Sequence, residues 1–344
     1  MRQNIRRLVT GAAAALMCCI FGLSAVSCGS SPGSSSGDST DDISVVCTIF
    51  PEYDWVRNIL GDNPGSVKLS CLTDNGADMH SYQPTTEDIM RISSCDIFIY
   101  VGGESDSWVS GVLDTAVNKD MRVLSLMDTL ESSLREEELK EGMENAGAES
   151  AEIHDEAEYD EHVWLSLRNA QRICSAAAEL LCEADPENAG YYQENLEGYT
   201  GKLSELDSSF SRLAQELSPE RKTLIFGDRF PFRYFTEDYG FDYYAAFVGC
   251  SAETEASFST IAFLAQKADE INAGTICVIE GSDHSIAESV ADNMKTPGVT
   301  ITELDSIQSV TRQDIKDGAT YLSIMEKNCE SLCNALEGVQ EKNA

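Results

Sequence analysis

Three of the four histidines in this 344-residue chain lie where the sequence predicts the ends of strands. His80 follows the second expected strand, His162 the fourth and His284 the seventh. Carboxylates stand at comparable positions, at Asp228, Glu280 and Asp283. Imidazole nitrogens and carboxylate oxygens are ligands of Zn²⁺, and a set richer in carboxylates suits Mn²⁺. The remaining histidine, His154, lies in an acidic run, where compositional bias alone explains it.

Strand-like and helix-like stretches alternate along most of the chain. Alternation of this kind indicates parallel sheets covered by helices. Ligands of such open sheets bind beyond the carboxyl ends of the strands, so the histidines and carboxylates are expected to meet in one cleft. The fold expected is α/β, with two similar (β/α)4 lobes at residues 43–130 and 219–338 and a metal cleft between them. The strands are expected at residues 43–49, 67–72, 96–101, 122–126, 222–226, 241–248, 275–280 and 299–302.

A long helix is expected to join the two lobes, within a helical region at residues 162–218. Asp185-Pro186-Glu187 is a helix start signal, with Asp as the cap and Pro at the first helical position. From Tyr192 to Leu217, apolar residues recur at alternating steps of four and three. A helix from Glu187 to Leu217 would be roughly 45 Å long at about 1.5 Å per residue. A single unbroken seam of this length favours a spine packed along both lobes.

Residues 131–161 interrupt the alternation with a dense run of Asp and Glu. Such a block cannot bury enough apolar surface to fold by itself, which predicts a solvated loop. We expect that deleting Glu136 to Glu158 would leave the fold nearly intact.

The chain begins with the layout of a lipoprotein signal peptide at residues 1–27. Arg2, Arg6 and Arg7 precede an apolar stretch, and Ala25-Val26-Ser27 precedes Cys28. Cys28 is the expected lipidation site, followed by a flexible Gly/Ser-rich tether at residues 28–42. A plain signal peptide or an uncleaved anchor helix is the alternative. Residues 339–344 form a tail.

The net charge and the cysteine content limit which partners and which cysteine chemistry are expected. The formal net charge of −35 disfavours nucleic acid and anionic lipid as partners and attracts cations. Nine cysteines remain beyond Cys28, with no CxxC pair. Because most lie in apolar runs, we expect them to be mostly reduced and to act as small hydrophobic residues.

Four stretches resemble the zinc- and manganese-binding solute receptors of bacterial ABC importers. They begin at Phe50-Pro51-Glu52-Tyr53, Met79-His80-Ser81-Tyr82, Asp160-Glu161-His162-Val163 and Asp185-Pro186-Glu187-Asn188. The resemblance implies an extracytoplasmic, lipid-anchored monomer at the outer face of the cell membrane. It also implies a permease partner and metal ligands at His80 and His162. The family's third ligand position falls on Arg229, which cannot coordinate, and an offset of one residue gives Asp228. The fourth falls at or beside Asp283 and His284.

The sequence therefore predicts one metal ion, Zn²⁺ with Mn²⁺ as the alternative, held by His80, His162, Asp228 and His284. Glu280 and Asp283 are the alternative ligands. Two other functions stay open, a zinc-dependent hydrolase with Glu161 or Glu280 as the base, and a surface adhesin. No HExxH motif, nucleophile elbow or phosphate-binding glycine loop supports an enzyme.

Overall fold

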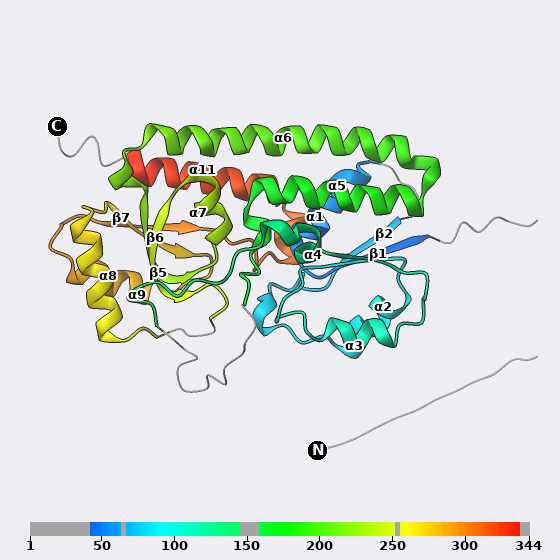
Figure 1. Ribbon diagram of the computed structural model, residues 1–344, viewed down its shortest axis with the longest axis horizontal. Helices are drawn as coiled ribbons and strands as arrows, with labels where there is room; N and C mark the ends of the chain where they lie inside the picture. Colours follow the sequence, from blue (N-terminus) through cyan, green and yellow to red (C-terminus); the bar gives the residue numbers. More distant parts are fainter. Residues whose placement is uncertain (1–41, 63–66, 145–157, 252–254, 338–344) are drawn as a thin grey trace, which may run out of the picture. The chain divides into compact units, whose positions relative to one another are not determined.

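Four parallel strands build the sheet of the N-terminal lobe in the computed structural model, which describes residues 42–62, 67–144, 158–251 and 255–337 (Figure 1). The sheet order is β2-β1-β3-β4. This order places β1 and β3 at the centre, where their apolar side chains are buried. The strands are β1 (Ile43–Cys47), β2 (Val67–Cys71), β3 (Ile97–Tyr100) and β4 (Arg122–Ser125). The helices of this lobe are α1 (Phe50–Leu60), α2 (Thr86–Ser94), α3 (Val109–Asp114) and α4 (Leu126–Leu130).

The C-terminal lobe repeats the arrangement, with a second parallel sheet in the order β6-β5-β7-β8. Its strands are β5 (Thr223–Phe230), β6 (Asp242–Val248), β7 (Thr275–Ile279) and β8 (Thr300–Leu304). Its helices are α7 (Arg233–Tyr239), α8 (Phe258–Glu270), α9 (Ser285–Asn293), α10 (Arg312–Lys316) and α11 (Tyr321–Glu337). The expected α/β class with two four-stranded parallel lobes is therefore confirmed. One detail differs: β5 continues past Phe226 through an irregularity in its register with β6, so Asp228 lies within the strand.

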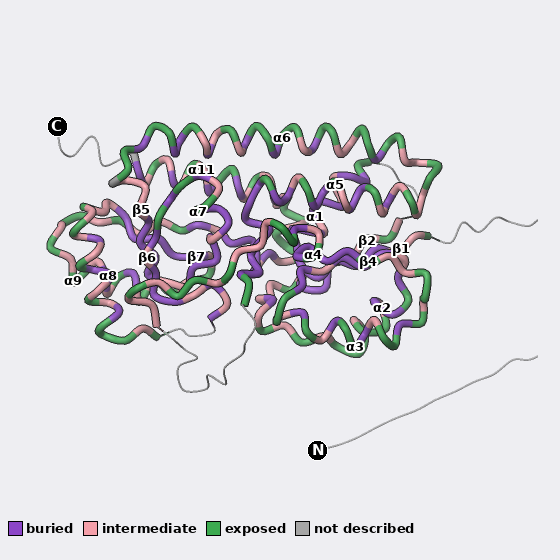
Figure 2. The backbone as a smooth tube through the Cα atoms, viewed as in Figure 1, coloured by how far each residue is buried: buried purple, intermediate pink, exposed green. Residues whose placement is uncertain are grey.

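The expected spine is α6 (Ala189–Glu216), preceded by α5 (Leu167–Ala184). Helix α6 contacts α1 of the N-terminal lobe and α7 of the C-terminal lobe, and it also packs on α5 and α11 (Figure 1). Its buried residues face the rest of the protein and its outer face is exposed (Figure 2). They are Ala214 and six residues of the predicted seam: Tyr192, Tyr199, Leu203, Leu206, Phe210 and Leu213. Leu196 of the seam is partly buried, and Leu217 follows the end of the helix. The apolar periodicity thus identified both the helix and the face it buries.

Residues 134–144 of the acidic segment form a surface loop without buried residues, as expected, but this loop also contacts the C-terminal lobe. Its backbone forms an antiparallel bridge between Glu136 and Tyr159, and the Glu144 amide donates to the Ala246 carbonyl oxygen at 2.9 Å. Within the deletion range, Glu138 pairs with Arg233 and Lys140 pairs with Asp242, both in the C-terminal lobe. A deletion from Glu136 to Glu158 would remove these contacts, and its effect on the fold stays a prediction. Residues 145–157, with His154, lie outside the described residues.

The expected signal peptide, Cys28 and nearly all of the tether also lie outside the described residues. Among those that the structure does describe, no helix is both long and apolar enough to cross a membrane.

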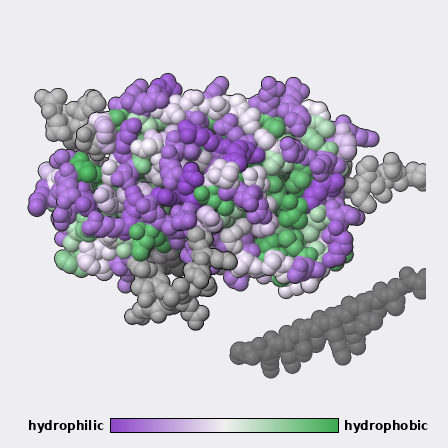
Figure 3. All heavy atoms as spheres, viewed as in Figure 1, coloured by the Kyte–Doolittle hydropathy of each residue, from purple (hydrophilic) through white to green (hydrophobic). Residues whose placement is uncertain are grey.

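The face in Figure 3 is largely hydrophilic, with its larger apolar areas over the N-terminal lobe. Five of the described cysteines are buried, as expected for small hydrophobic residues: Cys47, Cys71, Cys95, Cys174 and Cys277.

The packing of the acidic segment can be tested at Gly142. This residue has φ +89°, and a Cβ there would overlap the ring of Phe263. Gly142→Ala is expected to lower the free energy of unfolding by about 1–2 kcal/mol, the cost of a left-handed backbone for a residue with a Cβ. Gly198→Ala is the matched control, because Gly198 lies in α6 with open space around it. It should raise stability by about 0.5–1 kcal/mol. Chemical denaturation measures both, and an unchanged Gly142→Ala midpoint would show that this segment is loosely held.

Candidate metal site

His80 reaches the cleft from a short 3-10 turn after β2, Met79–Ser81. The turn begins at Asp78, whose carboxylate accepts a hydrogen bond from the His80 amide at 3.0 Å. The His80 side chain is almost completely buried. Its Nδ1 lies 2.8 Å from Ser105 Oγ and 3.4 Å from Glu161 Oε2. These contacts fix the imidazole plane and leave Nε2 facing the second lobe.

His162 is fully buried at the start of another 3-10 turn, Val163–Leu165. Hydrogen bonds on both sides hold this segment. The Tyr234 hydroxyl donates to the Asp160 carbonyl oxygen at 2.8 Å, and the Trp164 indole donates to the Ser306 carbonyl oxygen at 2.9 Å. The Asp160 carboxylate faces Nδ1 of His162 at 3.0 Å. His162 therefore presents Nε2 from a segment anchored to the C-terminal lobe.

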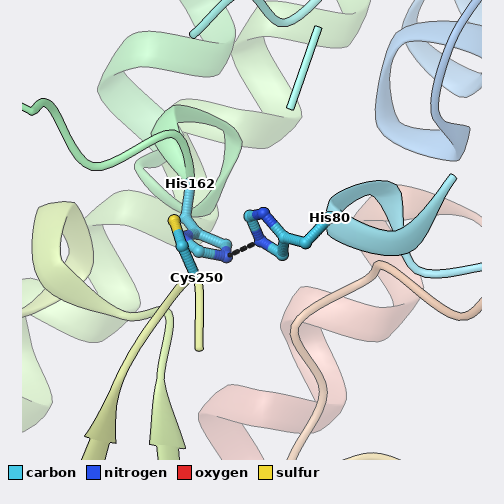
Figure 4. A group of neighbouring side chains, drawn as sticks. All are labelled: His80, His162 and Cys250. Atoms are coloured by element: carbon cyan, nitrogen blue, oxygen red, sulfur yellow. Dashed lines mark hydrogen bonds between the residues drawn. The ribbon is translucent and has the colours of Figure 1, made fainter. Parts of the chain in front are cut away.

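Cys250 is a third donor, which sequence reasoning did not assign to the site. It lies two residues beyond the end of β6 and is half-buried. One donor atom from each of His80, His162 and Cys250 lies within 4.8 Å of the others (Figure 4). Within the described part of the chain, this is the one such group of three metal-binding side chains. The available signal was its position after the sixth strand, where the expected cleft opens.

The two imidazoles meet directly, with Nε2 of His80 3.0 Å from Nε2 of His162 (Figure 4). Each Nδ1 faces a carboxylate, Glu161 for His80 and Asp160 for His162. A carboxylate accepts a hydrogen bond from Nδ1–H, and this tautomer leaves a lone pair on Nε2. With both rings in this tautomer, the two Nε2 atoms would offer two lone pairs to one cation.

Electrostatics keep His162 neutral and Glu161 charged but favour the protonated thiol of Cys250. Burial lowers the pKa of His162, although the Asp160 charge opposes this, so the ring is neutral near pH 7. Burial alone would raise the pKa of Glu161, but hydrogen bonds from His80 and Ser105 outweigh it and the pKa is lowered. Burial, with the charges of Glu137, Asp160 and Glu161, raises the pKa of the Cys250 thiol.

Two clefts open from the cluster, with volumes of about 580 and 590 Å³, and both are lined by His80 and Cys250. The first also contains the predicted carboxylates Asp228, Glu280 and Asp283. The second is lined by acidic groups, among them Glu104, Glu137, Glu158 and Glu161.

The structure brings His80 and His162 together and leaves the other predicted ligands outside their cluster. Asp228 Oδ1 accepts from the Arg229 amide at 2.8 Å. The Glu280 carboxylate accepts from Ser306 and Gln308, and burial, with the charge of Asp305, raises its pKa to about 7. Asp283 accepts from the Ser285 amide at 2.9 Å.

His284 lies at the start of α9 with φ 66°. It follows β7, as expected, but it is not among the described residues that line the clefts.

The chain thus consists of two parallel α/β lobes, a helix that packs on both, and a cluster of His80, His162 and Cys250 beside two clefts. The chain matches the family model described as "ZnuA: Zinc-uptake complex component A periplasmic" over residues 45–335. It therefore belongs to that family.

Relatives agree in sequence and structure. The chain is 28% identical over 291 residues to the zinc-binding lipoprotein AdcA of Streptococcus pneumoniae R6, covering 84% of this chain and 55% of that protein. It is 28% identical over 314 residues to the high-affinity zinc uptake system protein ZnuA of Bacillus subtilis, and the match covers 90% of this chain and 92% of that protein. The periplasmic zinc binding protein TroA of Treponema pallidum is similar with a TM-score of 0.68 and 26% identity, covering 86% and 99%. The chain spans about half the length of the first curated relatives it matches.

The carboxylate behind His162 can be tested separately from the ligands. Asp160→Asn replaces the charged acceptor at Nδ1. Loss of such a supporting group should weaken metal binding by roughly 10–100-fold. Competition with a chromophoric chelator measures the affinity for zinc. Glu183→Gln is the control, because Glu183 is an exposed carboxylate paired with Arg122. Equal affinities for both variants would contradict the supporting role of Asp160.

Proposed function

We propose that this protein captures Zn²⁺ in the cleft between its lobes and delivers it to the permease of an ABC importer, with Mn²⁺ as the alternative cargo. The observation that carries the proposal is the meeting of two imidazole Nε2 atoms at 3.0 Å, each backed by a carboxylate at Nδ1. The hydrogen bond between the rings places a proton on one Nε2, and a metal cation would take the place of that proton between the two nitrogens.

The donor arrangement suits zinc. At a Zn–N distance of about 2.0–2.1 Å, two nitrogens of a tetrahedral site lie roughly 3.3–3.4 Å apart. The two Nε2 atoms are 3.0 Å apart, so a small outward movement of one ring would admit the ion. The carboxylates behind the rings raise their basicity and hold the required tautomer.

Further coordination comes from the C-terminal lobe in our proposal. Asp228 is the first candidate carboxylate, because it lines the same cleft as His80. Glu280 and Asp283 line this cleft as well and stay alternatives. Glu280 is the weaker of these, because both its oxygens already accept hydrogen bonds. His284 would need a rearrangement at the start of α9 to contribute.

A hydrolase is disfavoured by the position of Glu161. Its Oε1 accepts from the Ser105 amide at 3.0 Å, while its Oε2 faces Nδ1 of His80. This carboxylate supports an imidazole and is not free to act as a base on a metal-bound water. The match to a receptor family agrees with that interpretation. No contact in the described residues favours an adhesin over a receptor.

Ligand removal tests the capture function. His80→Ala and His162→Ala should each abolish the stabilisation by zinc, which is about 2.7 kcal/mol at a free concentration 100 times the dissociation constant. Thermal unfolding with and without zinc measures it. For the wild type, zinc affinity should fall in acid at a pH below the ordinary imidazole pKa of about 6.5, because His162 must be unprotonated to bind metal and burial lowers its pKa. A full zinc-induced shift in both variants would overturn the proposed function.

We also propose that the protein is an extracytoplasmic monomer anchored to the outer face of the cell membrane by a lipid on Cys28. The small residues before Cys28 and the Gly/Ser-rich stretch after it support this. Cys28→Ala should move the protein from the membrane fraction to the soluble fraction after cell fractionation. Retention of the variant in the membrane fraction would favour an uncleaved anchor helix.

A further inference from the structure

We propose that Cys250 binds the metal as a thiolate, and that this sulfur ligand makes the site select Zn²⁺ against Mn²⁺. The inference rests on the proposed function and assigns a ligand within that site. It gives the C-terminal lobe a direct bond to the ion, beside the two imidazoles.

The geometry places the sulfur where a third ligand is needed. Sγ of Cys250 and the two facing imidazoles lie within 4.8 Å of one another. With a Zn–S distance of about 2.3 Å, sulfur and nitrogen ligands of a tetrahedral zinc lie roughly 3.5–3.6 Å apart. Figure 4 shows the Cys250 side chain against the ring of His162, whose other edge faces His80. Only small side-chain movements separate this arrangement from a His₂Cys site.

Arg229, at the third ligand position of the resembling family, cannot bind a metal ion. Arg229 is a cation, and its guanidinium pairs with Asp78 at the start of the turn that carries His80. On the neighbouring strand, Phe247 is the register partner of Arg229, and Cys250 follows three residues later. The thiol of Cys250, after the end of β6, thus lies close to position 229 in β5, where the resembling family has a metal ligand.

The backbone before Cys250 is fitted against His162. A Cβ at Gly249 would lie 2.9 Å from His162 Cε1 and 2.8 Å from the Phe230 carbonyl oxygen. Only glycine permits this approach, which brings the turn after β6 onto the imidazole. The Cys250 amide also donates to Glu137 Oε1 at 3.4 Å. The position of the thiol therefore follows from tight packing on one side and a carboxylate on the other.

The other described cysteines have a different setting. Cys47, Cys71, Cys95, Cys174 and Cys277 are buried, as small hydrophobic residues are. Cys182, Cys329 and Cys333 lie in helices α5 and α11. Cys250 is the one described cysteine within a cluster of imidazoles.

A thiolate changes which metal the site prefers. Soft sulfur ligands favour Zn²⁺, whereas Mn²⁺ prefers carboxylate, carbonyl and water oxygens. Binding converts the Cys250 S–H to a metal-bound thiolate and releases the proton to solvent. A His₂Cys set would therefore hold zinc and discriminate against manganese before any carboxylate contributes.

Cobalt substitution tests the ligand directly. The protein, purified under reducing conditions, is titrated with Co²⁺ and then with Zn²⁺ and Mn²⁺ in competition with a chelator. A cobalt–thiolate bond gives a charge-transfer absorption in the near ultraviolet, which nitrogen and oxygen ligands do not give. The wild type should show this band, and zinc should abolish it. Cys250→Ser should lack the band and bind zinc at least roughly 10–100-fold more weakly, since a lost ligand should cost no less than a lost supporting group.

Two further variants make the result specific. Cys250→Asp keeps a metal donor but replaces sulfur by oxygen, so it should bind metal without the band and with a smaller preference for zinc over manganese. Cys182→Ser removes a half-buried thiol elsewhere, in α5, and should behave as the wild type. A wild-type cobalt spectrum without the band, or unchanged zinc affinity in Cys250→Ser, would overturn the inference. If His80→Ala still abolishes zinc binding in that case, the proposed function survives and only the sulfur ligand is refuted.

Discussion

The feature on which the site depends is a buried contact between like groups. Two imidazole nitrogens face each other at 3.0 Å, and the carboxylates of Glu161 and Asp160 occupy the opposite edges of the rings. The two nitrogens share a hydrogen bond, and this buried contact persists only where the surroundings fix both rings. The turns that carry His80 and His162 do this through hydrogen bonds to their own backbone and, for the second, to the C-terminal lobe.

The lobes that carry these turns are joined by more than one route, which limits how far they can separate. Helix α6 packs on both lobes, and α11 contacts α1 and α6. Tyr321 at the start of α11 links the two sides, because its amide donates to Asp54 and its hydroxyl donates to the Trp164 carbonyl oxygen. Arg312 also pairs with Asp74 across the lobes. Packed interfaces of this kind favour small sliding movements over wide hinge opening. Metal capture therefore needs to move individual side chains more than whole lobes.

Most of the architecture was predictable because apolar periodicity reports burial directly. All eight strands and the long seam from Tyr192 to Leu217 were recognisable from the sequence. Two features were not. A lone cysteine after an apolar strand, such as Cys250, has the same sequence signal as a core residue. The contacts of the acidic segment were missed because composition counts charges without showing their partners, here Arg233 for Glu138 and Asp242 for Lys140. Asp228 was placed beyond a strand that in fact continues past it.

The charge around the cluster links metal binding to stability. Glu137, Asp160 and Glu161 are all largely removed from solvent and close to Cys250, whose pKa they help to raise. Asp106 also lies near Glu161. Burial and the charge of Glu161 raise the pKa of Asp106 to about 6, although a hydrogen bond from the Gly102 amide opposes the shift. Several carboxylates in one partly buried region repel each other, and a divalent cation offsets that repulsion. The folded protein without metal is thus held in an electrostatically unfavourable state that the cation relieves. An ion that neutralises its surroundings binds the folded chain only, so each increment of affinity is also an increment of folding stability.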